Sequence, residues 1–165
     1  MLLATFCCAC VLQAQNANPL TAEAKQSYTV VKNNLVKMAD KMPEQDYSFK
    51  PTPEMQTFLQ RMAHTANVNI GACGVIKGEK KSVEVTANTT KSEVVAAVRD
   101  SFAYCDGVFD SMSDAEATQM VNFRGGQHPK LAVLYAVIIH SNEMYGYMSV
   151  YMRLKGIVPP SSEPK

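Results

Sequence analysis

Two histidines lie within helix-like segments and are the residues best suited to binding chemistry. His64 and His140 each sit near the middle of a periodic apolar segment, and Met144 follows His140 by one full helical turn on the same face. Imidazole nitrogens bind zinc, nickel and copper, whereas a thioether is a soft donor suited mainly to copper(I). The three residues form a candidate metal site, although a structural role for each histidine stays open.

Other polar residues near this pattern offer alternatives. Glu143 points about 100° away from Met144 around the helix, and a site of two histidines and a carboxylate is left open. His128 precedes His140 by twelve residues, or roughly 18 Å of helix, which is too far for a shared ion. Packing is the expected role of the aromatic residues Tyr145, Tyr147 and Tyr151, with a hydroxyl in the site as the alternative. Arg153 is either an ion-pair partner near the site or a cation at a helix end.

Four segments with helical periodicity must position these side chains. Apolar residues recur at steps of three and four in four stretches, which we expect to begin after Pro19, at Thr52, at Thr90 and at His128, and to end near Pro43, Gly78, Ser113 and Gly156. Thr90 and Glu93 have the spacing of a capping box. The stretch from 115 to 127 reads as a long loop with a turn at Gly125 and Gly126. These patterns predict an all-α protein, a single four-helix bundle.

The amino terminus resembles an export signal. It is an uncharged apolar run, MLLATFCCACVLQAQ, with a rough small-residue cleavage site at residues 12–14; a buried N-terminal helix is the alternative. We therefore expect a signal peptide at 1–15, the bundle at 16–160, a disordered tail at 161–165 and a periplasmic or secreted location. Cleavage would leave Cys73 and Cys105, either as a disulfide or as separate buried residues.

The charge distribution limits the partners. Sixteen basic and fifteen acidic residues give a net charge of +1, and the small cluster of Lys77, Lys80 and Lys81 surrounds Glu79. Nucleic-acid-binding domains concentrate basic residues on one face, so nucleic acid is not an expected partner. No membrane association is expected once the signal is removed.

Several stretches resemble the DinB-like superfamily. One is HSNEMYG at 140–146, followed by VYMRLKGIVPP at 150–160, and another is YSFKPTPE at 47–54, which leads through Phe58 to His64. The resemblance implies a DinB-like four-helix bundle with long connections between helices. It also implies a divalent metal held by three histidines, one from the second helix and two from the last. His64 and His140 match two of these positions, and Met144 occupies the third.

The resemblance leaves the activity open. Enzymes of this superfamily include thiol-dependent transferases, in which a metal activates a small thiol, and metal-dependent hydrolases. We expect an exported protein with a degenerate His64, His140 and Met144 site, acting as a non-catalytic or ligand- or metal-binding bundle. The alternative is such an enzyme using His64 and His140. The expected cofactor is weakly bound zinc or nickel, copper(I), or none, with a small molecule in a central cleft; a homodimer is left open.

Overall fold

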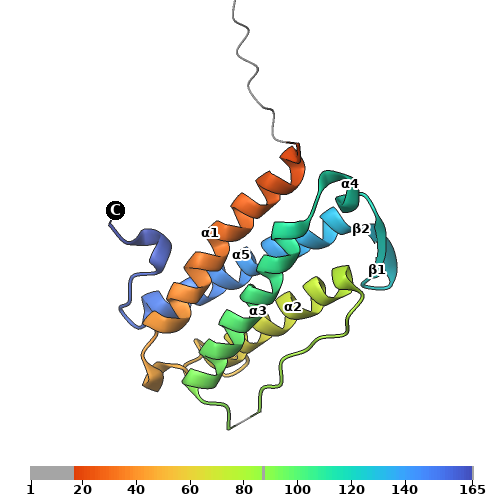
Figure 1. The fold of residues 1–165 in the computed structure, drawn as a ribbon. Helices are drawn as coiled ribbons and strands as arrows, with labels where there is room; N and C mark the ends of the chain where they lie inside the picture. Colours follow the sequence, from red (N-terminus) through yellow and green to blue (C-terminus); the bar gives the residue numbers. More distant parts are fainter. Residues whose placement is uncertain (1–16, 87, 165) are drawn as a thin grey trace, which may run out of the picture.

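The structure, a computed structural model, describes residues 17–86 and 88–164 and is mostly helical. Figure 1 shows the elements, which are α1 (Pro19–Lys41), the 3-10 helix η1 (Glu44–Asp46), α2 (Phe58–Lys77), α3 (Lys91–Ser111), the short α4 (Asp114–Ala117), β1 (Met120–Phe123), β2 (Gly126–Pro129), α5 (Lys130–Leu154) and the 3-10 helix η2 (Pro160–Ser162). The long helices pack in the order α1, α3, α2, α5, with α5 also against α1. The predicted all-α four-helix bundle is confirmed.

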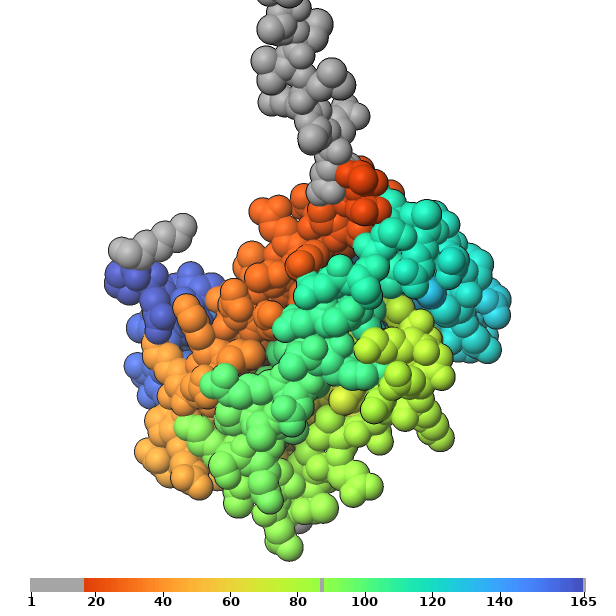
Figure 2. Space-filling model, viewed as in Figure 1, coloured from red at the N-terminus to blue at the C-terminus, as the bar shows by residue number. Residues whose placement is uncertain are grey.

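The buried stripes of the helices supply one core. Ala24, Tyr28, Val31, Leu35 and Met38 of α1 are fully buried or nearly so, as their spacing predicts. The predicted stripe of α2 is also buried, and it includes two polar residues, Thr65 and Asn69. Figure 2 shows the face formed by α1, α3 and the end of α2.

The predicted start of the second helix is wrong. Thr52 to Met55 form a turn, in which the Met55 N–H donates to the Thr52 carbonyl at 3.2 Å, and α2 begins only at Phe58. Thr57 and Gln60 make a reciprocal capping box there, because each side chain accepts the other residue's backbone N–H. The box predicted at Thr90 and Glu93 is confirmed.

The stretch predicted as a loop between the third and last helices contains α4 and a β-hairpin. β1 and β2 pair antiparallel, and Phe123 is opposite Gly126. The two residues between them, Arg124 and Gly125, have φ angles of 51° and 82°. A two-residue type I′ hairpin turn requires positive φ at both of these positions. His128 therefore lies in β2 rather than at a helix start, and the hairpin packs against α2 and α5. Four-residue strands are too short for alternation to reveal them in the sequence.

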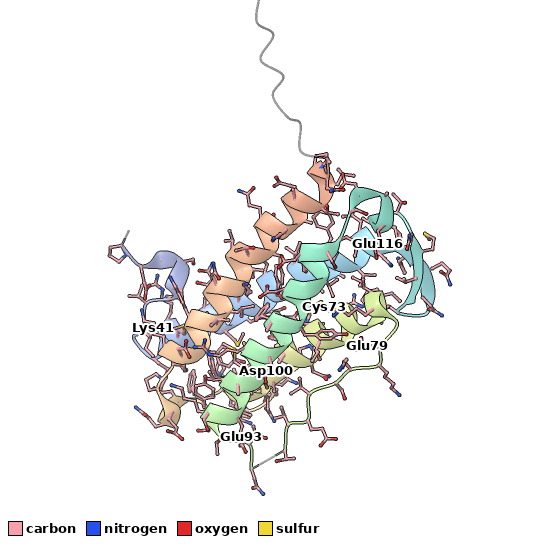
Figure 3. All side chains as sticks on the ribbon, viewed as in Figure 1. Lys41, Cys73, Glu79, Glu93, Asp100 and Glu116 are labelled. Atoms are coloured by element: carbon pink, nitrogen blue, oxygen red, sulfur yellow. A yellow bond between two sulfur atoms is a disulfide. The ribbon has the colours of Figure 1, made fainter. Side chains whose placement is uncertain are left out.

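A disulfide joins the two helices that pack most extensively. Cys73 of α2 and Cys105 of α3 are bonded, with Cα atoms 5.5 Å apart, and both are fully buried (Figure 3 labels Cys73). Of the two alternatives left open by the sequence, the structure has the bridge. The expected signal segment at 1–15 lies outside the described residues.

The carboxyl end is more ordered than expected. Residues 160–162 form η2, Ser161 hydrogen bonds to the Tyr145 hydroxyl, and Glu163 pairs with Lys41. The predicted disordered tail is therefore wrong for residues 161–163, because these contacts hold the segment against α1 and α5. Over 17–86 and 88–164, none of the helices has the length and apolar character needed to cross a membrane.

Candidate functional site

The two histidines predicted from the sequence meet between α2 and α5. The Nε2 atoms of His64 and His140 are 3.1 Å apart, and the ring planes are inclined by 65°. His64 is exposed and His140 is half-buried. The pair thus lies at the surface of the bundle.

A buried polar contact beside the pair holds the two helices in register. The Ser141 hydroxyl donates to Oδ1 of Asn69 at 3.1 Å, and both residues are fully buried. Buried polar groups are costly unless they are paired, so this contact favours one alignment of α2 and α5. Ser141 follows His140 directly, and the contact therefore fixes the position of this part of α5 relative to α2.

The distance between the imidazoles is compatible with two kinds of interaction. At 3.1 Å, one ring N–H can donate to the other ring's Nε2. Two nitrogen ligands of a tetrahedral zinc ion, each about 2.0–2.1 Å from the metal, would be separated by about 3.3 Å. Binding of zinc would also require a ligand at the third position, whereas a hydrogen bond between the rings would not.

The third position carries a thioether in contact with a cation. Met144 is buried, and its Sδ lies 4.0 Å from Nη1 of Arg61. The Arg61 guanidinium lies over the Tyr147 ring, 5.1 Å from its centroid, and forms no ion pair with any described residue. Its Nε is buried without a hydrogen-bond partner among those residues. A divalent cation at this position would face an uncompensated positive charge, so these residues do not fit the three-histidine metal site.

The alternative third ligands do not complete a site either. Across 17–86 and 88–164, no three His, Cys, Asp or Glu side chains are grouped closely enough to hold a metal. Glu143 is exposed, and the two-histidine plus carboxylate alternative is therefore not formed. His128 packs edge-on against Phe123, with ring centroids 6.2 Å apart.

The remaining polar candidates from the sequence have other roles. The Tyr151 hydroxyl donates to the Gln56 carbonyl at 2.8 Å, and the Tyr145 hydroxyl bonds to Ser161. Tyr147 is the one of the three tyrosines that borders the site, through its contact with Arg61. Arg153 is exposed near the end of α5 and makes no ion pair with the described residues.

Burial lowers the pKa of His140, and the neighbouring His64 and Arg124 add to this shift, whereas Glu143 opposes it. We expect His140 to titrate below its ordinary value of 6.5 in a pH series followed by NMR of the imidazole protons. His64→Ala should move that titration toward higher pH, and His128→Ala serves as the matched control. An unshifted His140 titration in the natural protein would contradict this electrostatic description.

The sign of the linked stability effect follows from the lowered pKa. The folded state favours neutral His140, so this residue contributes fully to stability above the unfolded-state value of 6.5. The contribution is lost as the pH falls through the lower pKa of the folded protein. His140→Gln should remove this part of the acid sensitivity.

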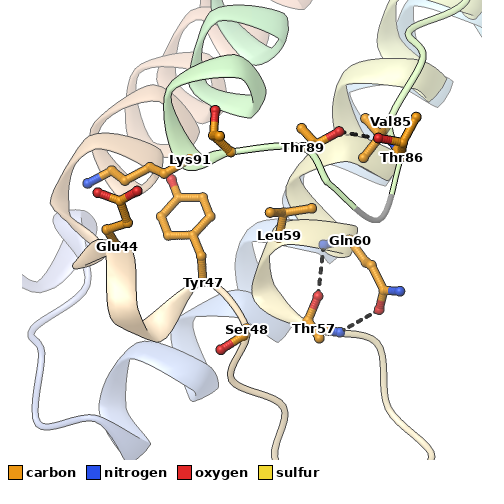
Figure 4. A pocket seen from close by; sticks show the side chains of 11 residues that line it. Glu44, Tyr47, Ser48, Thr57, Leu59, Gln60, Val85, Thr86, Thr89 and Lys91 are labelled. Atoms are coloured by element: carbon orange, nitrogen blue, oxygen red, sulfur yellow. Dashed lines mark hydrogen bonds between the residues drawn. The ribbon is translucent and has the colours of Figure 1, made fainter.

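A separate cavity of about 610 Å³ lies between η1, the start of α2 and the connection to α3 (Figure 4). Its polar side chains largely serve the protein itself. Thr57 and Gln60 form the capping box of α2, and Nζ of Lys91 donates to the carbonyls of Asp40 and Met42. Because these groups already form hydrogen bonds within the protein, few polar groups remain to recognise a ligand.

Comparison with known proteins identifies the family. The model of the DinB superfamily matches residues 28–148. This chain belongs to the DinB superfamily. No curated protein matches its sequence.

Several solved structures share its fold. A DinB-like protein from Bacillus cereus ATCC 10987 has a TM-score of 0.69 at 24% identity, over 84% of this chain and 95% of that chain. A conserved protein from Enterococcus faecalis has a TM-score of 0.63 at 12% identity, over 81% and 95% of the two chains. A mycothiol-dependent maleylpyruvate isomerase has a TM-score of 0.62 at 15% identity, over 77% of this chain and 58% of the isomerase. These identities establish a shared fold alone.

Arg61 is the site residue that the sequence reasoning missed. It precedes His64 by three residues on α2, just as Tyr147 follows Met144 by three on α5. Residues three apart share a helix face, and this spacing was the available signal.

Proposed function

We propose that this DinB-superfamily chain is a non-catalytic binding protein whose His64–His140 pair does not serve a divalent metal. The contact between the Arg61 guanidinium and the Met144 thioether supports this proposal above all. Two unit charges 4 Å apart near a protein surface repel by roughly 4 kcal/mol, and a divalent ion doubles the charge product. Binding of the divalent metal on which the superfamily's metal chemistry depends would therefore be electrostatically unfavourable at this site.

The same side chains favour a small anion, such as a carboxylate. Arg61 is a cation without an acidic partner among the described residues, and a guanidinium matches the planar geometry of a carboxylate. Each neutral imidazole carries one N–H donor, and when one of them is used between the rings, the other remains for a further hydrogen bond beside the cation. Glu143 partly offsets the positive potential around His140.

Two titrations test the proposal. Calorimetry with zinc, nickel and copper(I) should reveal no stoichiometric binding that depends on His64. Thermal unfolding with acetate, malonate and phosphate should show stabilisation by at least one of these anions that Arg61→Gln abolishes. Arg99→Gln, which removes an exposed arginine paired with Asp40, is the matched control and should retain the effect.

Opposite results would support the other functions. Tight binding of one zinc or nickel ion, lost in both His64→Ala and His140→Ala, would favour the metal-dependent hydrolase or thiol transferase. Selective copper(I) binding would favour the His64, His140 and Met144 soft site. The isomerase neighbour supports the enzyme alternative by fold only.

We also propose that the protein is exported. A structural disulfide forms and persists in oxidising compartments, and the Cys73–Cys105 bridge is consistent with a periplasmic or secreted location. The apolar residues 1–15 supply the corresponding signal. Sequencing of the amino terminus from the native host should then begin near Gln15.

A further inference from the structure

The outer face of α5 exposes several large apolar side chains. This helix of 25 residues contains one acidic residue, Glu143, and two basic residues near its ends. Ile139, Val150 and Leu154 are 66%, 55% and 59% exposed, and Tyr135 and Tyr147 are exposed beside them. Large apolar side chains gathered on one exposed face, with polar residues beside them, indicate an interaction surface.

The exposed residues fall on one stripe. Positions 139, 143, 146, 150 and 153 are separated by steps of four, three, four and three, and all five are exposed. This is the spacing with which one helix packs along another. Gly146, at the centre of the stripe, has no side chain and leaves room for a facing residue.

The charges on this stripe are complementary to those of the same stripe on a second copy of the chain. Glu143 and Arg153 form no ion pair with any described residue. If two copies of α5 align antiparallel with residue 148 at the centre, Glu143 of each copy faces Arg153 of the other. The same alignment sets Val150 opposite Gly146. A parallel alignment would instead bring Glu143 to Glu143 and Arg153 to Arg153.

We propose that the outer face of α5 binds a second copy of this chain in an antiparallel, two-fold symmetric dimer. Val150, opposite Gly146, lies near its centre, two Glu143–Arg153 pairs set its direction, and Ile139 and Leu154 extend the apolar contact beyond these pairs. A two-fold interface uses the same patch on both subunits, as this self-complementary stripe requires. The inference is independent of the ligand proposed for the histidine pair.

Sedimentation equilibrium of the full chain tests the dimer. The natural protein should dimerise, and Glu143→Arg and Arg153→Glu should each raise the dimer dissociation constant roughly tenfold or more, because like charges then face each other. The double variant, which restores opposite charges, should return close to the natural value. Val150→Glu, at an exposed position that does not threaten folding, should also dissociate the dimer.

A charge reversal elsewhere provides the control. Asp100 is exposed on α3 (labelled in Figure 3), and Asp100→Arg should leave the dissociation constant unchanged. If the natural protein stays monomeric at several hundred micromolar, the proposal is overturned, and this face would then serve a different partner. A dimer that resists Val150→Glu would also overturn it. Failure of the double variant to restore binding would refute the antiparallel alignment.

Discussion

Replacing both Cys73 and Cys105 with alanine should lower the free energy of unfolding by about 3–4 kcal/mol. The bridge joins residues separated by 32 positions, and closing a loop of this length removes conformational entropy from the unfolded chain. Alanine is the appropriate replacement because both sites are fully buried, where a serine hydroxyl would need a partner. Urea unfolding of the oxidised natural protein and the double variant measures the difference.

Reduction provides the matched control. A phosphine reductant should bring the natural protein to nearly the stability of the double variant and should leave that variant unchanged. Two thiols that react with iodoacetamide in the denatured, unreduced protein would show that the bridge is absent. Equal stability of the natural and doubly substituted proteins would contradict the predicted contribution.

Replacing Met144 with histidine and removing the positive charge of Arg61 should together create a zinc site. We expect Arg61→Gln combined with Met144→His to raise zinc affinity on the order of 100-fold or more, since about 2.7 kcal/mol corresponds to that ratio. The substitutions supply a third imidazole one turn from His140 and remove a repulsion of several kcal/mol. Competition with a chromophoric chelator measures the affinity.

The single variants separate the two causes. Met144→His alone should gain less affinity, because the new imidazole remains against the guanidinium. Arg61→Gln alone should gain little, because only two nitrogen ligands are present. His64→Ala in the doubly substituted background should abolish the gain. If Met144→His alone matches the double variant, Arg61 does not oppose metal binding, and the electrostatic basis of the proposed function fails.

The chain keeps the fold of the DinB superfamily, and the resemblance implies that Met144 stands in place of one of the family's histidines. The shared architecture with proteins at 12–24% identity shows that the bundle tolerates extensive substitution. A buried stripe requires only apolar residues of suitable size, whereas a metal site requires particular ligands at particular atoms. Replacement of one ligand residue would therefore leave the bundle intact.

The four long helices and their buried faces could be predicted from the sequence, because helical periodicity is a local property of the chain. The sequence also determined that His64 and His140 lie near the middle of two helices, and that Thr90 and Glu93 cap α3. Two helix starts were predicted wrongly. Thr52–Pro53–Glu54 resembles a helix start, but the reciprocal box at Thr57 and Gln60 satisfies two backbone N–H groups and begins α2 later. His128 lies in β2, and α5 begins at Lys130.

Which side chains meet is set by the tertiary structure. The contact of His64 with His140 depends on the alignment of α2 and α5, which no periodicity in either helix specifies. Likewise, the disulfide depends on the packing of α2 against α3, and the contact between Arg61 and Met144 joins residues of two different helices. Pairwise contacts between distant segments arise from packing geometry, and composition and spacing along one segment do not encode them.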